Sequence, residues 1–598
     1  MTIDNFMAGS HKNVGAGGYA VELETDDRPV RLGRVFIAVA VVALALWLLP
    51  HRASIPPRVE SDYCYQLIAA DRLYDGRGLT SLQPVAPRQP WTWAYDFGFL
   101  TQWPPGYSLM VAGLRFATGA ATMEVCQWIS IFASAAALVG WFVLIRRSVP
   151  GGVPASLLAA VGAGCAVSFT SFVNPSTDAL IVAVLPYVLL FVTRALAVQR
   201  KRNGGIPTYL GTRSHEGGRV TGDEGAQPFV STPRAQTPSC LCRFAALGFV
   251  SGALFWIRYA AVFVPCAGAL FLFIEWFRRC RCHFGRCVFA FVVASLLPIV
   301  TLLWINRIYG PPVALHTQLN LGERVGFGDW LGPLAAAWWQ FTDLGYYGYQ
   351  AWAHWLYALW PAFMLAAAMA VPPVRRSLGK IITSPPILLG AVLVGVLLAM
   401  LVGATVVFGN KFRYVHLDRY YLPVRPFYFL LFAAPVLWIR QRWVRWASAV
   451  LLSLAGVWTL QHEWGSDYMR SRRSLAEVTA YGQRATCFTP GAGALYTWLG
   501  TLDSDAVIFS NFHDYITLET GRPAYPIPPD PAALVQCVGD IVSNRGIEEP
   551  RVLLVLDPDN RWRSYFLPPL SEVLARFQLT NRVEIPGSPA VAVYEASE

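Results

Sequence analysis

Long apolar runs alternate with short polar tracts along most of the 598-residue chain. A run of about twenty apolar residues is long enough to cross the hydrocarbon core of a bilayer as an α-helix. Such runs predict membrane-spanning helices at about 33–50, 124–145, 154–172, 178–198, 286–306, 353–371 and 385–408, with shorter ones at 425–439 and 446–461. The pattern therefore predicts a polytopic α-helical membrane protein.

The apolar stretch 244–275 is too long for one span, because a helix of about thirty residues measures ~45 Å. Arg258 and Tyr259 interrupt it. We therefore predict two short helices that meet near Arg258, which brings the expected number of transmembrane helices to about eleven. Residues 106–120 are expected to form a re-entrant or interfacial helix instead of a full span.

Basic residues set the orientation expected for these helices, because Lys and Arg concentrate in cytoplasmic loops of membrane proteins. Basic tracts occur here in alternate loops, at Arg31 and Arg34, Arg146 and Arg147, 200–243, 278–286, 375–380 and 440–445. The alternation predicts a cytosolic N-terminus. It places the first outer loop, 51–123, the loop 307–352 and everything after about 462 on the outer side.

The polar segments divide the chain into expected domains. Residues 1–32 read as a disordered cytosolic tail, and 200–243 as a flexible cytosolic loop within a transmembrane domain that spans 33–461. Residues 462–598 change character, because amphipathic stretches alternate there with the short apolar runs AVIFS (506–510), RVLLVL (551–556) and AVAVYE (590–595). This alternation predicts a small C-terminal extracytoplasmic α/β domain.

Composition agrees with a membrane location. The chain is 55% hydrophobic and only 14% charged, with a mean hydropathy of +0.40, whereas soluble chains carry roughly a quarter charged residues. The 22 tryptophans suit the aromatic belts of membrane proteins. A net charge of +11 would suit nucleic-acid binding, but the basic residues lie between apolar runs as topology signals. No nucleic-acid partner is expected, whereas contact with membrane lipid is.

A group of cysteines was considered as a metal site. Cys280, Cys282, His283 and Cys287 lie in and beside the basic tract RRCRCHFGR (278–286), with a spacing that matches no standard zinc pattern. We therefore assign no metal there.

Acidic residues gather immediately after the first apolar run. The segment VESDYCYQLIAADRLYDGRGL (59–79) places Glu60, Asp62 and Asp71 close to the bilayer edge. Acids beside apolar spans are costly unless they are paired or hydrated, so their clustering favours a functional role. For any one of these acids alone, a solvated loop is the simpler interpretation.

Further motifs follow this acidic segment in a fixed order. They are A-x-x-L-x-x-G-x-G (70–78), PPGYSLMVAGL (104–114), NPSTDAL (174–180), LGFVSGALFWIRYAAVFVP (247–265), RYYLPVRPF (419–427), and VIFSN followed by TGRPAYPIP (507–528). The ordered set resembles the GT-C superfamily of membrane glycosyltransferases, most closely the branch of the protein O-mannosyltransferases and aminoarabinose transferases. The resemblance covers most of the chain.

The resemblance implies a sugar donor carried on a polyprenyl phosphate and transfer at the outer face of the membrane. It also implies that Asp62, the acid after the first span, acts as catalytic base or positions the acceptor. The protein mannosyltransferases carry an adjacent Asp-Glu pair, whereas here Ser61 separates Glu60 from Asp62. That difference leaves the acceptor open between lipid, glycan and protein, and leaves Glu60 only as a possible supporting residue.

The chemistry can be considered without the resemblance. Inverting transfer needs a base that removes the acceptor proton while the lipid phosphate leaves from the opposite face of the sugar. The leaving phosphate needs cations, preferably Arg. No cofactor is required, and a divalent metal stays an alternative, although no His/Asp cluster surrounds Asp62.

Arg258 is the first candidate for the phosphate, because an unpaired guanidinium within an apolar stretch needs an anion nearby. Snorkelling to the interface and pairing with a neighbouring acid are its alternatives. Arg419 and Tyr420 are second candidates. Asp178 either joins the Asp62 site or caps the helix that follows it. Tyr63 packs the loop or stacks on a sugar.

The C-terminal segment shows no catalytic motif. His513 and Asp514 are expected on a loop with a structural role, and the segment is expected to hold the acceptor or shape the outer cleft. The main alternative function is a membrane transporter or flippase for a lipid-linked or polar solute, which needs charges along a route through several spans. A structural membrane subunit is a third interpretation. We expect a bacterial inner-membrane location.

Overall fold

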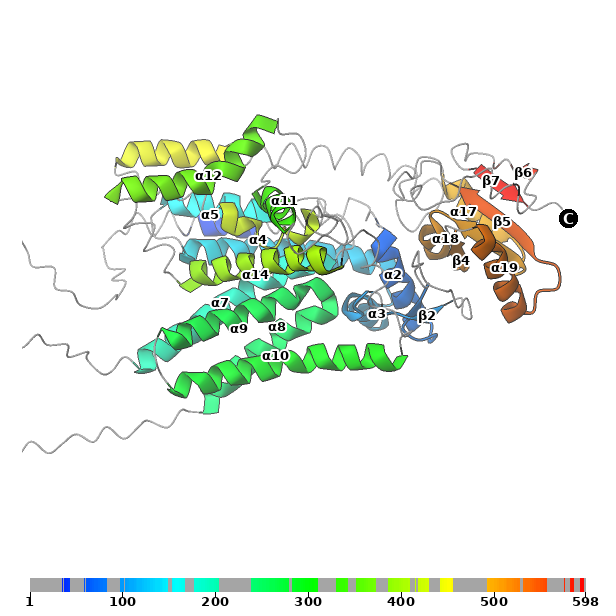
Figure 1. Ribbon diagram of the computed structural model, residues 1–598, viewed down its shortest axis with the longest axis horizontal. Helices are drawn as coiled ribbons and strands as arrows, with labels where there is room; N and C mark the ends of the chain where they lie inside the picture. Colours follow the sequence, from blue (N-terminus) through cyan, green and yellow to red (C-terminus); the bar gives the residue numbers. More distant parts are fainter. Residues whose placement is uncertain are drawn as a thin grey trace, which may run out of the picture.

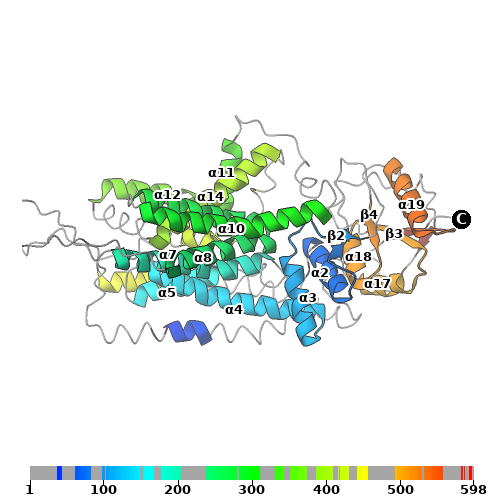
Figure 2. The same cartoon turned by 90° about the horizontal axis from the view of Figure 1, so that it is seen from below.

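The structure is a computed structural model that describes residues 35, 37–43, 59, 61–82, 97–101, 103–148, 153–166, 177–203, 238–278, 282–309, 330–342, 351–372, 385–408, 415, 418–429, 441–454, 492–527, 531–556, 575, 581–583, 585 and 592–595. Long helices run side by side through most of the molecule, and a small mixed sheet lies at one end (Figures 1 and 2). The helices α2 and α3 lie between the bundle and the sheet.

Five helical segments of the described chain are long and apolar enough to cross a membrane: Thr122–Ser148, Thr177–Val198, Tyr259–Phe277, Phe284–Tyr309 and Pro385–Val407. They belong to α4 (Thr122–Ser148), α7 (Thr177–Asn203), α9 (Phe263–Phe277), α10 (Cys282–Tyr309) and α14 (Pro385–Phe408). All five coincide with predicted spans. Shorter helices accompany them: α5 (Val153–Ala166), α8 (Pro238–Ile257), α11 (Leu331–Thr342) and α12 (Ala351–Ala370). The total of eleven stays a prediction, because several expected spans lie wholly or partly outside the described residues.

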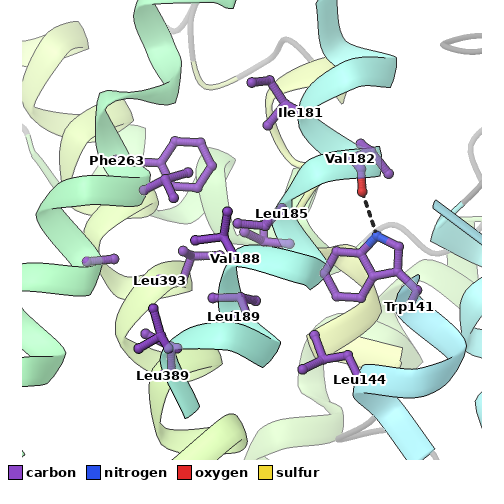
Figure 3. Packing of buried hydrophobic residues seen from close by; sticks show 14 of the residues in the cluster. Trp141, Leu144, Ile181, Val182, Leu185, Val188, Leu189, Phe263, Leu389 and Leu393 are labelled. Atoms are coloured by element: carbon purple, nitrogen blue, oxygen red, sulfur yellow. Dashed lines mark hydrogen bonds between the residues drawn. The ribbon is translucent and has the colours of Figure 1, made fainter. Parts of the chain in front are cut away.

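The bundle core is made of apolar side chains from α4, α7, α9 and α14 (Figure 3). Trp141 is fully buried there, and its indole Nε1 donates to the carbonyl oxygen of Val182 at 2.9 Å. The bond removes the cost of burying a polar N–H group in an apolar core. Large apolar side chains such as Phe289, Leu297 and Trp304 are exposed on α10, as expected of a helix that faces acyl chains.

Two glycines let α8 approach α10 closely. A Cβ atom at Gly248 would lie 2.1 Å from the backbone oxygen of Phe291, and one at Gly252 would lie 2.1 Å from that of Ser295. These glycines are four residues apart and therefore share one face of α8. Membrane helices pack by such close backbone contact, because the lipid removes most of the hydrophobic driving force between them.

The predicted break near Arg258 is confirmed. The helix α8 ends at Ile257, and Arg258 takes an extended conformation, with φ −154° and ψ 128°. The 3₁₀ turn η1 (Tyr259–Val262) then leads directly into α9. The backbone N–H of Arg258 still donates to the carbonyl oxygen of Leu254 at 3.0 Å, so the break interrupts the helix at a single residue.

The first loop, which is expected on the outer side, contains α2 (Ser61–Tyr74), the strands β1 (Thr80–Ser81) and β2 (Gly98–Phe99), which pair antiparallel, and α3 (Gly106–Thr118). The 13 residues of α3 are too few to cross a bilayer, which agrees with the expected interfacial or re-entrant helix. Arg115 of α3 donates to Asp71 of α2 at 2.6 Å, and Thr122 donates to the same carboxylate. The acid Asp71 is therefore a structural partner of these helices.

The C-terminal sheet has the strand order β4-β3-β5-β7-β6. Its strand β3 (Ala506–Ser510) lies parallel to β4 (Ala524–Pro526) and to β5 (Arg551–Leu556). The strand β7 (Ala592–Glu595) pairs antiparallel with β5 and with β6 (Asn581–Val583). The expected strands at 506–510, 551–556 and 590–595 correspond to β3, β5 and β7. The accompanying helices are α17 (Ala492–Thr501), α18 (His513–Thr520) and α19 (Pro531–Arg545).

The sheet region and the first loop share one hydrophobic core. Leu67 and Ile68 of α2 are buried in the same cluster as Leu495, Ile508 and Phe512. The helix α18 packs directly against α2. Because buried contact joins these two segments, the C-terminal region contributes to the shape of the loop that carries the predicted acids. The domain division at 461/462 and an outer location stay predictions.

Candidate functional site

The break after α8 places Arg258 among polar side chains from three other elements. Its guanidinium forms an ion pair with Asp178, the second residue of α7. Its Cζ atom also lies 4.4 Å from the centroid of the Tyr420 ring, in the 3₁₀ turn η3 (Asp418–Tyr420). Tyr63 of α2 donates from its hydroxyl to Asp178 Oδ2 at 3.1 Å. We call these four residues the arginine cluster.

A second cation lies beside the arginine cluster. The Cζ atom of Arg419 is 5.9 Å from the centroid of the Tyr420 ring. Both arginines therefore contact the same aromatic ring, whose negative face attracts cations. Five of the residues singled out in the sequence are thus brought to one place, although they come from positions 63, 178, 258, 419 and 420 of the chain.

The ion pair within the arginine cluster is almost completely withdrawn from solvent. The side chain of Asp178 is 4% exposed and that of Arg258 is 13% exposed. Removing one member of a buried pair typically costs about 3–5 kcal/mol, because the other charge is then left without compensation. Of the alternatives for Arg258, pairing with an acid is therefore observed. The side chain of Asp178 faces this cluster and contacts both Tyr63 and Arg258.

The two predicted acids of the first loop are only partly placed. Asp62 belongs to α2 and directly precedes Tyr63 of the arginine cluster, but its side chain lies outside the described part of the chain. Glu60 lies outside the described residues altogether. The roles given to both acids stay predictions.

Three neighbouring elements hold the Arg258 break in position. A Cβ atom on Gly106, the first residue of α3, would lie 2.5 Å from the backbone oxygen of Trp256. The hydroxyl of Tyr259 donates to the carbonyl oxygen of Thr101 at 2.6 Å, and Nδ2 of Asn306 donates to that hydroxyl at 2.8 Å. The loop and α10 thus fix the turn that carries Arg258.

The sequence indicated these supporting residues only weakly. Gly106 lies in the PPGY motif, which contributes to the family resemblance but does not indicate a packing role. Tyr259 interrupts an apolar run, which predicts the break but not the hydrogen bonds, and the sequence gives no signal for the role of Asn306. The tyrosine of the same motif, Tyr107, is fully buried. Burial raises the pKa of Tyr107 well above its usual value of 10, so its hydroxyl stays protonated and suits packing rather than acid–base chemistry.

A polar contact joins the first loop to the C-terminal region. The Tyr65 hydroxyl and Nε2 of His513 are 2.7 Å apart, and the Tyr65 ring stacks on Trp103 with centroids 4.4 Å apart. The Tyr515 hydroxyl donates to the carbonyl oxygen of Val59 at 3.0 Å. His513 and Asp514 were expected on a loop, but this was wrong, because they begin α18. Packing of α18 on α2 requires this short helix.

The described residues contain no group of three or more His, Cys, Asp and Glu side chains that could hold a metal ion. Of the cysteine cluster considered in the sequence, Cys280 lies outside the described residues, and the side chains of Cys282 and His283 are likewise not described. A divalent metal near Asp62 therefore stays the alternative that the sequence analysis gave.

No protein-family profile matches this sequence, and no curated protein is significantly similar to it. Solved structures do match. ArnT from Cupriavidus metallidurans, bound to undecaprenyl phosphate, aligns over 94% of this chain and 98% of its own length, with a TM-score of 0.51 and 13% identity. The same protein in its apo state aligns over 94% and 97%, with a TM-score of 0.50 and 13% identity.

At this identity the comparison concerns the fold. ArnT is an aminoarabinose transferase with the GT-C fold of membrane glycosyltransferases, and the alignment spans nearly the whole of both chains. The resemblance inferred from the ordered motifs is therefore confirmed at the level of the fold. Together with the five long apolar helices, the shared fold makes the chain an integral membrane protein.

Proposed function

We propose that this protein is a glycosyltransferase that moves a sugar from a polyprenyl-phosphate donor to an acceptor at the outer face of a membrane. The observation that supports the proposal best is the arginine cluster. It places a guanidinium at a break in a membrane helix, beside a second arginine and two tyrosines. The solved ArnT structure that shares this fold contains undecaprenyl phosphate, which is a ligand of the proposed class.

The chemistry of a lipid phosphate suits this position. Its polyprenyl chain requires an apolar surround, whereas its phosphate requires cations and hydrogen-bond donors. Arg258 offers a planar fork that can donate to two phosphate oxygens at once. Arg419 adds a second positive charge, and the hydroxyl of Tyr420 adds a donor. A phosphate at the break would thus meet charge and donors at the end of an apolar bundle.

The proposed reaction is a single displacement at the anomeric carbon. Asp62 takes the proton of the acceptor hydroxyl as the acceptor oxygen bonds to that carbon. The bond from the same carbon to the phosphate oxygen breaks, and its electron pair stays on the polyprenyl phosphate. The sugar is transferred with inversion, and the proton on Asp62 passes to solvent. Arg258 and Arg419 stabilise the negative charge that develops on the leaving phosphate.

The distribution of ion pairs favours this reading over a transporter. Arg258 with Asp178 lies before the first turn of α9, and Arg278 with Glu275 lies at its end. The residues of α9 between them are apolar or small, in the run FVPCAGALFLFI (263–274). A route for a polar solute needs polar groups along its length. Within the described helix α9 the only charged residue, Glu275, lies in the last turn.

The test uses purified protein in liposomes with a panel of polyprenyl-phosphate sugars and a crude envelope extract as acceptor. Release of free polyprenyl phosphate is followed for the natural protein, Arg258→Gln, Asp62→Asn and the control Arg278→Gln at the other end of α9. We expect donor turnover that falls by orders of magnitude in the first two variants and persists in the control. If the natural protein releases no polyprenyl phosphate from any donor, the proposal is wrong.

Loss of turnover in Arg258→Gln alone would support the lipid-phosphate site and remove Asp62 as base.

The orientation has its own test, because an added cysteine in the C-terminal region should react with a membrane-impermeant thiol reagent in intact cells. Protection of that cysteine until the cells are broken would overturn the outer location. In a bacterium with two membranes, the outer membrane is first permeabilised so that the reagent reaches the outer side of the inner membrane.

A further inference from the structure

The carboxylate of Asp178 already pairs with Arg258, the arginine that is proposed to bind the lipid phosphate. Its carboxylate pairs with Arg258 and accepts a hydrogen bond from Tyr63. Its side chain is only 4% exposed, so water screens its charge poorly. A buried carboxylate next to an anion-binding arginine weakens the binding of every anion. It weakens the binding of a doubly charged anion more than that of a singly charged one.

The two lipids of the proposed reaction differ in this property. The donor carries its sugar on a phosphodiester, which has one negative charge. The lipid left after transfer is a phosphomonoester, whose second pKa is ~6 and whose charge at neutral pH is about −1.5 to −2. A site made only of Arg258 and Arg419 would bind the spent lipid more tightly than the donor, because attraction grows with charge.

We propose that Asp178 is a specificity-determining residue that lowers the preference of the site for the doubly charged, sugar-free lipid phosphate relative to the singly charged, sugar-bearing donor. Asp178 thereby promotes release of the spent lipid after each transfer. The inference rests on the proposed function and deepens it. It uses the position of Asp178 beside Arg258 and not any change in the fold.

Coulomb's law gives the size of the effect. One extra negative charge about 6 Å from a carboxylate, at an effective dielectric constant of about 20, changes affinity by roughly 100-fold. Because the monoester carries between half and one additional charge at neutral pH, we expect a difference of about 10- to 100-fold. In the described part of the chain, Tyr420, Arg419 and Tyr63 act electrostatically on Arg258, the partner of Asp178. Arginine and tyrosine side chains ordinarily keep their charge states between pH 5 and 8.

The experiment measures direct binding, so it does not depend on turnover. A short isoprenyl phosphate and its methyl diester, which share one tail, are titrated against purified protein between pH 5 and pH 8. The readout is the ratio of the monoester Kd to the diester Kd. The diester keeps one charge throughout, so the ratio cancels any pH effect on the protein that weakens or strengthens the binding of both lipids alike.

As the pH passes ~6 the monoester gains a charge that Arg258 and Arg419 attract and Asp178 repels, so the ratio should fall less in the natural protein than in Asp178→Asn. At pH 8 the ratio in Asp178→Asn should be about 10- to 100-fold lower than in the natural protein, because the monoester binds more tightly there. Asp178→Glu, which keeps the charge, should retain the natural order. A merely structural role would weaken both lipids alike in Asp178→Asn and leave their ratio unchanged.

A ratio at pH 8 that is the same in the natural protein and in Asp178→Asn overturns the inference, and Asp178→Ser, which also removes the charge, provides the comparison if Asp178→Asn does not fold. In that outcome both lipids still bind, and the proposed function stands. If neither lipid binds to the natural protein at any pH, the lipid-phosphate site and the proposed function fail together with the inference.

Discussion

Replacing Gly106 with alanine tests how the first loop holds Arg258 in position. The added Cβ atom would lie 2.5 Å from the backbone oxygen of Trp256 and 2.8 Å from its carbonyl carbon. Favourable contacts between such atoms lie near ~3.5 Å, so the end of α8 has to move by up to about 1 Å. Both clashing atoms belong to the backbone, and rotation of a side chain cannot relieve them. Arg258 follows two residues later and moves with them.

The displacement sets the expected magnitude. A misplacement of ~1 Å in a group that positions a substrate can lower turnover by about 100-fold. Overpacking of this kind costs about 1–3 kcal/mol of stability. The matched control is Gly113→Ala on the same helix, where a Cβ atom meets nothing within 4 Å. Because alanine is the better helix former, the control should gain about 0.5–1 kcal/mol.

Two measurements separate the effects. Thermal unfolding compares the stability of both variants in the same detergent, and polyprenyl-phosphate release compares their turnover in the same liposomes. We expect Gly106→Ala to lose turnover at a temperature where it remains folded, and Gly113→Ala to keep it. Equal turnover in the two variants would refute the reasoning, because α3 would then not determine where Arg258 lies.

Three further changes have definite expected outcomes. Gly252→Ala should lower the stability of the protein by about 1–3 kcal/mol, because its Cβ would lie 2.1 Å from a backbone oxygen of α10. Gly403→Ala, with open space around it, should not destabilise the protein. Equal thermal unfolding temperatures for the two variants would contradict the close α8–α10 contact. Tyr65→Phe removes the hydrogen bond to His513 and should lower stability by about 1 kcal/mol. It should also speed amide hydrogen exchange in α18, and unchanged exchange would show that the bond does not hold this helix. Arg551→Ala breaks a partly exposed ion pair and should change stability by less than about 1 kcal/mol; a larger loss on thermal unfolding would show a structural role.

The sequence predicted the membrane helices because the length of an apolar run is a local property. The expected spans at 124–145, 178–198, 286–306 and 385–408 match α4, α7, α10 and α14. The break at Arg258 was also predictable, because a charged residue within a long apolar run interrupts the pattern that one span requires. The strands β3 and β5 were found at their observed bounds, because short, fully buried strands appear as continuous apolar runs.

Other features needed the folded chain. His513 and Asp514 were placed on a loop because eight residues of weak apolar pattern give no clear helical signal, and packing on α2 forms the helix instead. The close contacts of Gly106 and Gly252 were invisible, since a glycine in a sequence does not show what lies beside it. The catalytic assignment of Asp62 and the role of Glu60 stay predictions.

The sequence by itself determined that this is a helical membrane protein with a break at Arg258, because burial in a bilayer constrains each segment separately. It also supplied the residues of the arginine cluster as separate candidates. Only the tertiary structure decided that Tyr63, Asp178, Arg258 and Tyr420 meet, and that the acid pairs with the arginine. These contacts join residues that are 80 or more positions apart, and the packing of α2, α7, α8 and η3 fixes them. No local pattern in the chain records that packing.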